Sequence, residues 1–171
     1  MTSTPRTWRL VALMAVAASA ASACTNTSNP ASIRKQELSV SADTILGTGQ
    51  LSELQQRRAA WIARGIVDYR VELGISCFCG RDLTRPVLVE VRAGAVSKVW
   101  DLETGKSVAD LTRYPTITEL FDAAIAERSR GGHVSVAYDR ALGFPARLDV
   151  GTIANDAGTQ YFLAELTVLG R

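Results

Sequence analysis

A strict alternation of apolar and polar side chains runs from residue 69 to residue 79. Every second residue belongs to the apolar set: Tyr69, Val71, Leu73, Ile75, Cys77 and Cys79. The residues between them, such as Arg70 and Glu72, are mostly polar, charged or small. A period of two places alternate side chains on opposite faces of an extended chain. The segment is therefore predicted to be an antiparallel strand with one buried face.

Five further segments with alternating apolar residues predict strands. They cover residues 87–91, 96–101, 134–138, 144–150 and 162–168. In the last of them we expect Phe162, Ala164, Leu166 and Val168 to face the core. Between the strands at 134–138 and 144–150, Asp139 and Gly143 are expected to form the turn of a hairpin.

Two segments have the spacing of amphipathic helices. The first begins near Ser52, where Ser52 and Gln55 fit a capping box, carries Leu54, Trp61 and Ile62, and is expected to end at Gly65. The second begins with a capping box formed by Thr116 and Glu119. Its apolar stripe is Ile117, Leu120, Phe121, Ala124 and Ile125.

These elements follow one another in the order α-β-β-β-α-β-β-β, which predicts an α+β domain over residues 51–171. We expect a single antiparallel sheet of about six strands with both helices packed on its apolar face, because this buries every apolar stripe. One shared core is expected to contain Val71, Leu73, Phe121, Ile125, Leu148 and Leu166.

The first 23 residues have the features of an export signal. Arg6 and Arg9 precede a short apolar run, and small residues lead into Cys24. The run is too short for a membrane-spanning helix, which needs about 20 residues. A cysteine directly after the cleavage site is typical of a bacterial lipoprotein, in which Cys24 becomes lipidated; ordinary secretion after cleavage at Ala21-Ser22-Ala23 is the alternative.

Residues 24–50 are predicted to be a flexible tether between Cys24 and the domain, because the segment is polar and rich in turn-forming residues at its start. Gly47 and Gly49 resemble the start of a phosphate-binding loop. No predicted strand precedes them and a third glycine is missing, so a lead-in to the domain is the better interpretation.

Removal of the signal changes the charge balance. The whole chain has 19 basic and 17 acidic residues. Loss of Arg6 and Arg9 leaves 17 of each (19 − 2 = 17), so the mature chain is formally neutral. It has no basic patch of the kind that binds nucleic acid, and nucleic acid is not an expected partner.

Cys77 and Cys79 are the one group of residues in the sequence that could carry out chemistry. Thiols pair readily in an oxidising compartment. Residues two apart in a regular strand have Cα atoms about 6.6 Å apart, at the upper edge of the range of about 4.4–6.8 Å for a disulfide. A Cys77–Cys79 bridge therefore requires a kink at Phe78. Three interpretations remain open: a structural disulfide, a free thiol pair that binds a soft metal such as Cu(I), and a redox-active pair.

Other chemistry receives little support from the sequence. The single histidine, His133, is expected to be exposed on the face opposite Val134 and Val136, away from the cysteines. Hydrolase and phosphate-loop motifs are absent, and the carboxylates are scattered. We therefore predict no catalytic residues, no metal ligands and no cofactor.

Two segments resemble a family of uncharacterised bacterial lipoproteins that is classed as a domain of unknown function. They are the strand that ends Ile75-Ser76-Cys77-Phe78-Cys79, followed by Pro86-Val-Leu-Val-Glu-Val, and the turn Tyr138-Asp139…Leu142-Gly143-Phe144-Pro145. The resemblance covers about residues 61–169 and includes the helix that starts at Thr116-Ile117. It implies a similar fold and an envelope location, and it implies no activity.

The sequence thus favours a lipoprotein domain on the periplasmic or outer side of the cell envelope, anchored to the membrane through lipid on Cys24. The domain is expected to be a non-enzymatic binding or accessory module with a protein or small-molecule ligand. The alternative is a thiol-based function, redox or soft-metal binding, at Cys77 and Cys79.

Overall fold

The computed structural model describes residues 44–152 and 158–170, which form an α+β domain. The predicted signal 1–23, Cys24 and the tether as far as residue 43 lie outside the described residues. The elements in chain order are β1 (Thr44–Leu46), α1 (Leu51–Ala63), β2 (Tyr69–Cys77), β3 (Val87–Arg92), β4 (Ala95–Asp101), the 3-10 helix η2 (Leu111–Arg113), α2 (Ile117–Ser129), β5 (Val134–Asp139), β6 (Pro145–Val150) and β7 (Thr159–Val168). None of the described helices has the length and apolar character needed to cross a membrane.

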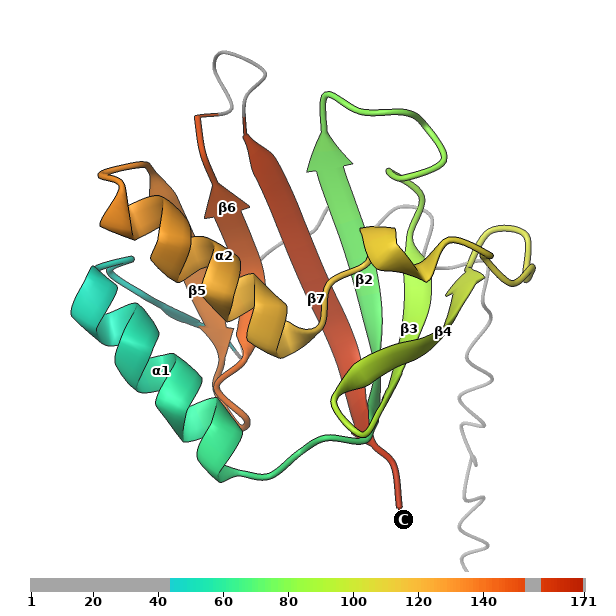
Figure 1. Cartoon of the computed structure of the whole chain (residues 1–171), viewed down its shortest axis with the longest axis horizontal. Helices are drawn as coiled ribbons and strands as arrows, with labels where there is room; N and C mark the ends of the chain where they lie inside the picture. The colour runs from blue at the N-terminus through green and yellow to red at the C-terminus, as the bar shows by residue number, and fades with distance from the viewer. Residues whose placement is uncertain (1–43, 153–157, 171) are drawn as a thin grey trace, which may run out of the picture. The chain divides into compact units, whose positions relative to one another are not determined.

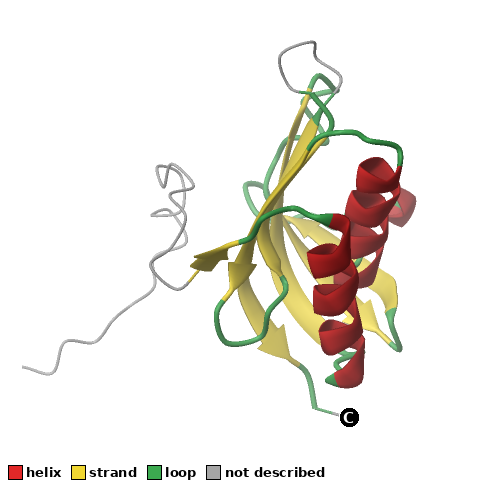
Figure 2. Cartoon of the chain, turned by 90° about the vertical axis from the view of Figure 1, so that its left-hand side faces the viewer, coloured by secondary structure: helices red, strands yellow, loops and turns green. Residues whose placement is uncertain are grey.

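The strands form one antiparallel sheet in the order β1-β5-β6-β7-β2-β3-β4. Helices α1 and α2 lie side by side over one face (Figures 1 and 2), as predicted. No described element covers the opposite face, which we call the open face. The sheet has seven strands, so the predicted count of about six is wrong. The additional strand, β1, lies within residues 24–50, where no strand was predicted.

Two glycines let the chain after β1 pass close to β5. The amide of Gly47 donates to the carbonyl of Val136 over 2.9 Å. A Cβ atom on Gly47 would collide with the ring of Tyr138, and one on Gly49 would collide with the carbonyl oxygen of Val134. Gly49 also has a φ of +65°, in the left-handed region that favours glycine. The two glycines therefore permit close backbone approach at the sheet edge.

We expect Gly49→Ala to lower the free energy of unfolding by about 2–3 kcal/mol, because it combines a left-handed backbone with a collision. Gly65 is a matched control: its φ is +64° and nothing lies within 4 Å of the added Cβ. Gly65→Ala should cost only about 1 kcal/mol for the backbone. Urea denaturation of both variants measures the difference, and equal losses would show that the Val134 contact is unimportant.

The helix starts differ in how they are capped. Thr116 and Glu119 form the predicted capping box of α2: the Glu119 amide donates to Thr116 Oγ1 over 3.2 Å, and the Thr116 amide donates to Glu119 Oε2 over 2.7 Å. The capping box predicted at Ser52 is wrong. The N-cap of α1 is Gln50, which makes no side-chain capping bond, and Ser52 lies inside the first turn.

The core lies between the helices and the sheet and contains the residues predicted for it. Val71, Leu73, Phe121 and Leu148 are each at most 3% exposed. Ile125 and Leu166 are partly buried and pack against the same cluster. The rings of Phe121 and Tyr138 stack, with their centroids 6.3 Å apart, so α2 is joined to β5 by aromatic packing.

One predicted face is wrong in β7. Phe162 and Ala164 lie on the open face, where Phe162 pairs with Gly74 of β2, whereas Leu163 points into the core and is 6% exposed. Val168, which was also expected in the core, is 53% exposed. Further along, a bulge opposite the segment from Arg70 to Glu72 gives Glu165 a φ of +50°. A bulge inserts one residue and changes which side chains face inward. Leu166 beyond it therefore returns to the core side, as predicted.

Candidate functional site

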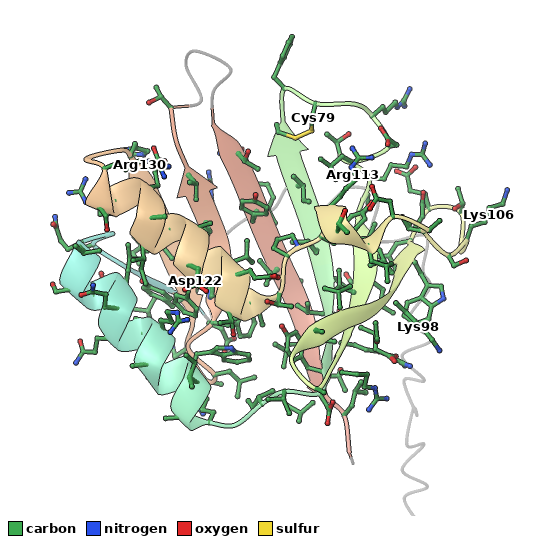
Figure 3. All side chains as sticks on the ribbon, in the orientation of Figure 1. Cys79, Lys98, Lys106, Arg113, Asp122 and Arg130 are labelled. Atoms are coloured by element: carbon green, nitrogen blue, oxygen red, sulfur yellow. A yellow bond between two sulfur atoms is a disulfide. The ribbon has the colours of Figure 1, made fainter. Side chains whose placement is uncertain are left out.

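The predicted cysteine pair lies in the connection between β2 and β3, residues 77–86, which we call the disulfide loop. The strand ends at Cys77 and the chain bends at Phe78 and Cys79. This is the kink that a bridge requires, since it brings the two Cα atoms to 5.2 Å. The structure joins the two sulfurs in a disulfide, drawn as the yellow bond beside Cys79 in Figure 3.

The three residues of the bridge differ in exposure. Cys77 is partly buried and packs against the core, whereas Cys79 is exposed. We expected both cysteines on the core face, and for Cys79 this is wrong because the strand alternation stops at Cys77. Phe78 between them is 85% exposed, the largest value among the exposed large hydrophobic residues of the described chain. The loop thus holds an aromatic ring in solvent.

Two ion pairs hold the rest of the disulfide loop against neighbouring elements. Arg113 of η2 donates to Asp82 over 2.7 Å, and Arg85 donates to Asp101 at the end of β4 over 2.8 Å. Figure 3 shows Arg113 close to the loop that carries Cys79. The loop is therefore attached at two points beyond the disulfide.

Hydrogen bonding favours the charged form of both carboxylates. The pKa of Asp101 lies below its usual value because the backbone amide of Thr104 and the Arg85 guanidinium donate to it. The hydrogen bond from Arg113 is the main cause of the lowered pKa of Asp82. Both groups stay ionised at neutral pH, which suits an ion pair and not a proton-transferring acid.

A hollow of about 300 Å³ lies between the disulfide loop and the connection from β4 to η2. Its wall includes both ion pairs and Tyr114, whose pKa is raised by burial. The two carboxylates of the ion pairs are satisfied by the opposing arginines, so neither offers an unpaired base. The arrangement is suited to holding the loop in place.

A second hollow, of about 360 Å³, lies on the open face and is lined by Arg70, Leu88, Trp100 and Leu102, among others. The guanidinium carbon of Arg70 lies 5.7 Å from the Trp100 ring centroid. Arg70 also pairs with the buried carboxylate of Glu90 over 2.6 Å, so its charge is already partly compensated.

The remaining titratable candidates do not join the cysteines. His133 is exposed and directly precedes β5, as predicted. Within residues 44–152 and 158–170, no group of three or more His, Cys, Asp or Glu side chains could hold a metal ion. The pKa of Glu72 is raised by burial and by the nearby Glu165, but neither residue lines the two hollows described above.

Sequence analysis missed the partners of the disulfide loop. It placed Phe78 opposite the apolar face, in agreement with its exposure, but did not identify the residue as part of a site. No sequence signal pairs Arg113 with Asp82, which lies 31 residues away. Such contacts depend on the tertiary arrangement of η2 and β3.

A comparison with protein-family models matches residues 53–168, and the matching model is described as a family of unknown function, DUF6174. No curated protein and no solved structure matches the chain. The match begins in the first turn of α1 and covers all later elements, with the disulfide loop in its interior.

Proposed function

Because the chain belongs to DUF6174, a family of unknown function, we propose its role from its own residues: an exported, lipid-anchored accessory domain that binds a partner protein through Phe78. The proposed role is binding without catalysis. One observation carries the proposal. Phe78 is 85% exposed and stands between the two cysteines of a disulfide, on a loop held by ion pairs.

An exposed aromatic ring on a constrained loop has the properties of a binding anchor. Large aromatic residues contribute much of the binding energy at protein interfaces. Ordering a flexible loop on binding opposes association, and a loop that is already constrained avoids that cost. Here the disulfide restricts the backbone around Phe78, and the pairs made by Asp82 and Arg85 restrict the following residues.

A protein surface suits this loop better than a lipid surface. Interfacial binding to lipid needs several apolar side chains and clustered basic residues. The disulfide loop offers one exposed aromatic residue, and its charges are Arg81, Asp82 and Arg85. Two of these three are already paired with Arg113 and Asp101. A pocket on a protein surface, unlike a lipid surface, can bind a single aromatic ring such as that of Phe78.

The proposed location rests on the predicted signal at residues 1–23 and on Cys24. Lipid on Cys24 would hold the domain at the envelope membrane, in the periplasm or on the outer surface. Such a compartment is oxidising, and disulfides persist there. The presence of the Cys77–Cys79 bond in the exported protein is part of this proposal.

We expect Phe78→Ala to weaken binding of the mature protein to envelope material by about tenfold or more, as for the loss of an aromatic hot spot. Mature protein carrying Cys24→Ser, labelled with a fluorophore, would be titrated onto envelope fractions from cells that lack the protein. The matched control is Leu46→Ala, because Leu46 is also an exposed apolar residue, at 79%.

Saturable binding that Phe78→Ala reduces and Leu46→Ala leaves intact supports a role for Phe78. Equal binding of all three proteins contradicts it. Vesicles of the envelope phospholipids serve as a second surface. Equal, Phe78-dependent binding to these vesicles would show that lipid, and not a protein, receives the ring.

A further inference from the structure

Building on the proposed function, we infer that the partner docking at Phe78 is a dithiol protein that exchanges with the Cys77–Cys79 disulfide. Cys79 Sγ is the atom that the partner attacks, and Cys77 Sγ is the leaving group. The inference names the chemistry of the partner and rests on the loop geometry described above.

The two cysteines differ in exposure. Cys77 is the last residue of β2, is paired in register with Thr159 of β7, and packs against the core. Cys79 lies past the strand end and is exposed. A thiolate on another protein must approach the sulfur that it attacks from solvent, so Cys79 is the sulfur within reach.

Exchange at Cys79 proceeds in two balanced steps. A thiolate of the partner attacks Cys79 Sγ, the bond between Cys79 and Cys77 breaks, and Cys77 leaves as a thiolate that takes a proton from water. The second thiol of the partner loses its proton and attacks the partner's own sulfur in the mixed disulfide, which releases the Cys79 thiolate, and this thiolate takes a proton from water. The domain gains two electrons and two protons, and the partner dithiol becomes a disulfide.

The short spacing of Cys77 and Cys79 favours a partner that has two thiols over a partner that has one. In the mixed disulfide, the Cys77 thiolate is only two residues from Cys79, so it can attack again and expel the partner. A monothiol has no means of competing with this return step. A dithiol can compete, because its second thiol is also held next to the mixed disulfide.

Phe78 lies where the partner surface must come. A protein that brings a sulfur to Cys79 Sγ comes next to Phe78, whose ring is 85% exposed and free to be contacted. Neither ion pair of Asp82 and Arg85 involves a cysteine, so we expect both to remain when the disulfide opens. We therefore expect the change to be confined to the start of the loop, so that reduction does not unfold the domain.

Reduction rates test the role of Phe78. The protein is the mature chain with Cys24→Ser, which leaves Cys77 and Cys79 as its two cysteines, and the probes are reduced thioredoxin and dithiothreitol. We expect Phe78→Ala to slow reduction by thioredoxin by about tenfold and to leave the dithiothreitol rate within about twofold. Leu46→Ala should change neither rate. An unchanged thioredoxin rate in Phe78→Ala overturns the inference.

The attacked sulfur is identified with thioredoxin that lacks its second cysteine. The return attack of Cys77 keeps the mixed disulfide at a low level, so it is captured at short times with N-ethylmaleimide, which blocks the released thiol. Fragmentation on either side of Phe78 then locates the thioredoxin-derived sulfur and the maleimide. We expect thioredoxin on Cys79 and maleimide on Cys77. The reverse assignment contradicts the inference.

Failure of the exchange and failure of the binding role give different results. If Phe78→Ala loses envelope binding but is reduced by thioredoxin as fast as the unaltered protein, the exchange inference falls and the binding role stands. If envelope binding is unaffected by Phe78→Ala, the proposed function falls, whatever the reduction rates show.

Discussion

Replacing Phe121 by alanine should lower the free energy of unfolding by about 3–5 kcal/mol, comparable to much of the stability of a small domain. Phe121 is 1% exposed, projects from α2 into the core, and stacks on Tyr138 of β5. Removing the ring reduces the apolar surface that is buried on folding, and it leaves a cavity that the surrounding strands can close only in part. Equilibrium urea denaturation of the mature protein gives the loss.

Phe78→Ala is the matched control for this prediction, since it makes the same truncation at a ring that is 85% exposed. An exposed side chain contributes little burial, so we expect a change within about 0.5 kcal/mol. A loss under about 1 kcal/mol for Phe121→Ala would show that α2 does not pack on the sheet as described. A large loss for Phe78→Ala would show that the ring is buried in solution.

Replacing Cys24 by serine should move nearly all of the protein out of the membrane fraction or leave the precursor uncleaved. A serine cannot form the thioether that would carry the lipid. Two acyl chains provide stable membrane anchoring. Their loss should therefore move most of the protein out of the membrane fraction. Fractionation of cells, with intact-mass measurement of the purified protein, reports both the location and the lipid.

Cys79→Ser is the control for fractionation, because it removes a different sulfur and should leave the protein with the membrane. A processed Cys24→Ser protein that still fractionates with membranes would contradict anchoring by lipid. Soluble protein in the absence of any substitution, with an unmodified Cys24, would instead indicate ordinary secretion after Ala23.

Most of the fold could be predicted from the sequence because local patterns and tertiary packing agree there. The period of two from Tyr69 to Cys77 became β2, and the capping box at Thr116 starts α2. The turn at Asp139 formed as expected: the Leu142 amide donates to its carboxylate over 2.5 Å, and Gly143 has a φ of +77°. Each of these signals involves residues close in sequence.

The errors arose where distant contacts decide the structure. β1 has only three residues, Thr44–Leu46, too few for a visible alternation, and it is positioned by pairing with β5. In β7 the run from Tyr161 to Ala164 is apolar at every position, so alternation could not select the inward face. Pairing with β2 and a bulge near Glu165 determine which side chains of β7 face the core.

The candidate site was predicted in part. The sequence located the cysteines and the kink at Phe78 that a bridge requires, both of which are local features. It did not indicate that the strand would end at Cys77 and so leave Cys79 exposed. It also did not indicate the ion pairs that attach Asp82 and Arg85 to η2 and β4, because these depend on how the loops meet.

Photo-crosslinking in living cells decides whether Phe78 contacts a partner protein. A benzophenone amino acid would replace Phe78 in one full-length protein and Leu46 in another, because both positions are highly exposed. We predict one discrete protein adduct from position 78 that is missing from position 46. The same adducts from both positions, or adducts from position 78 with lipid alone, would contradict a protein-binding role for the disulfide loop.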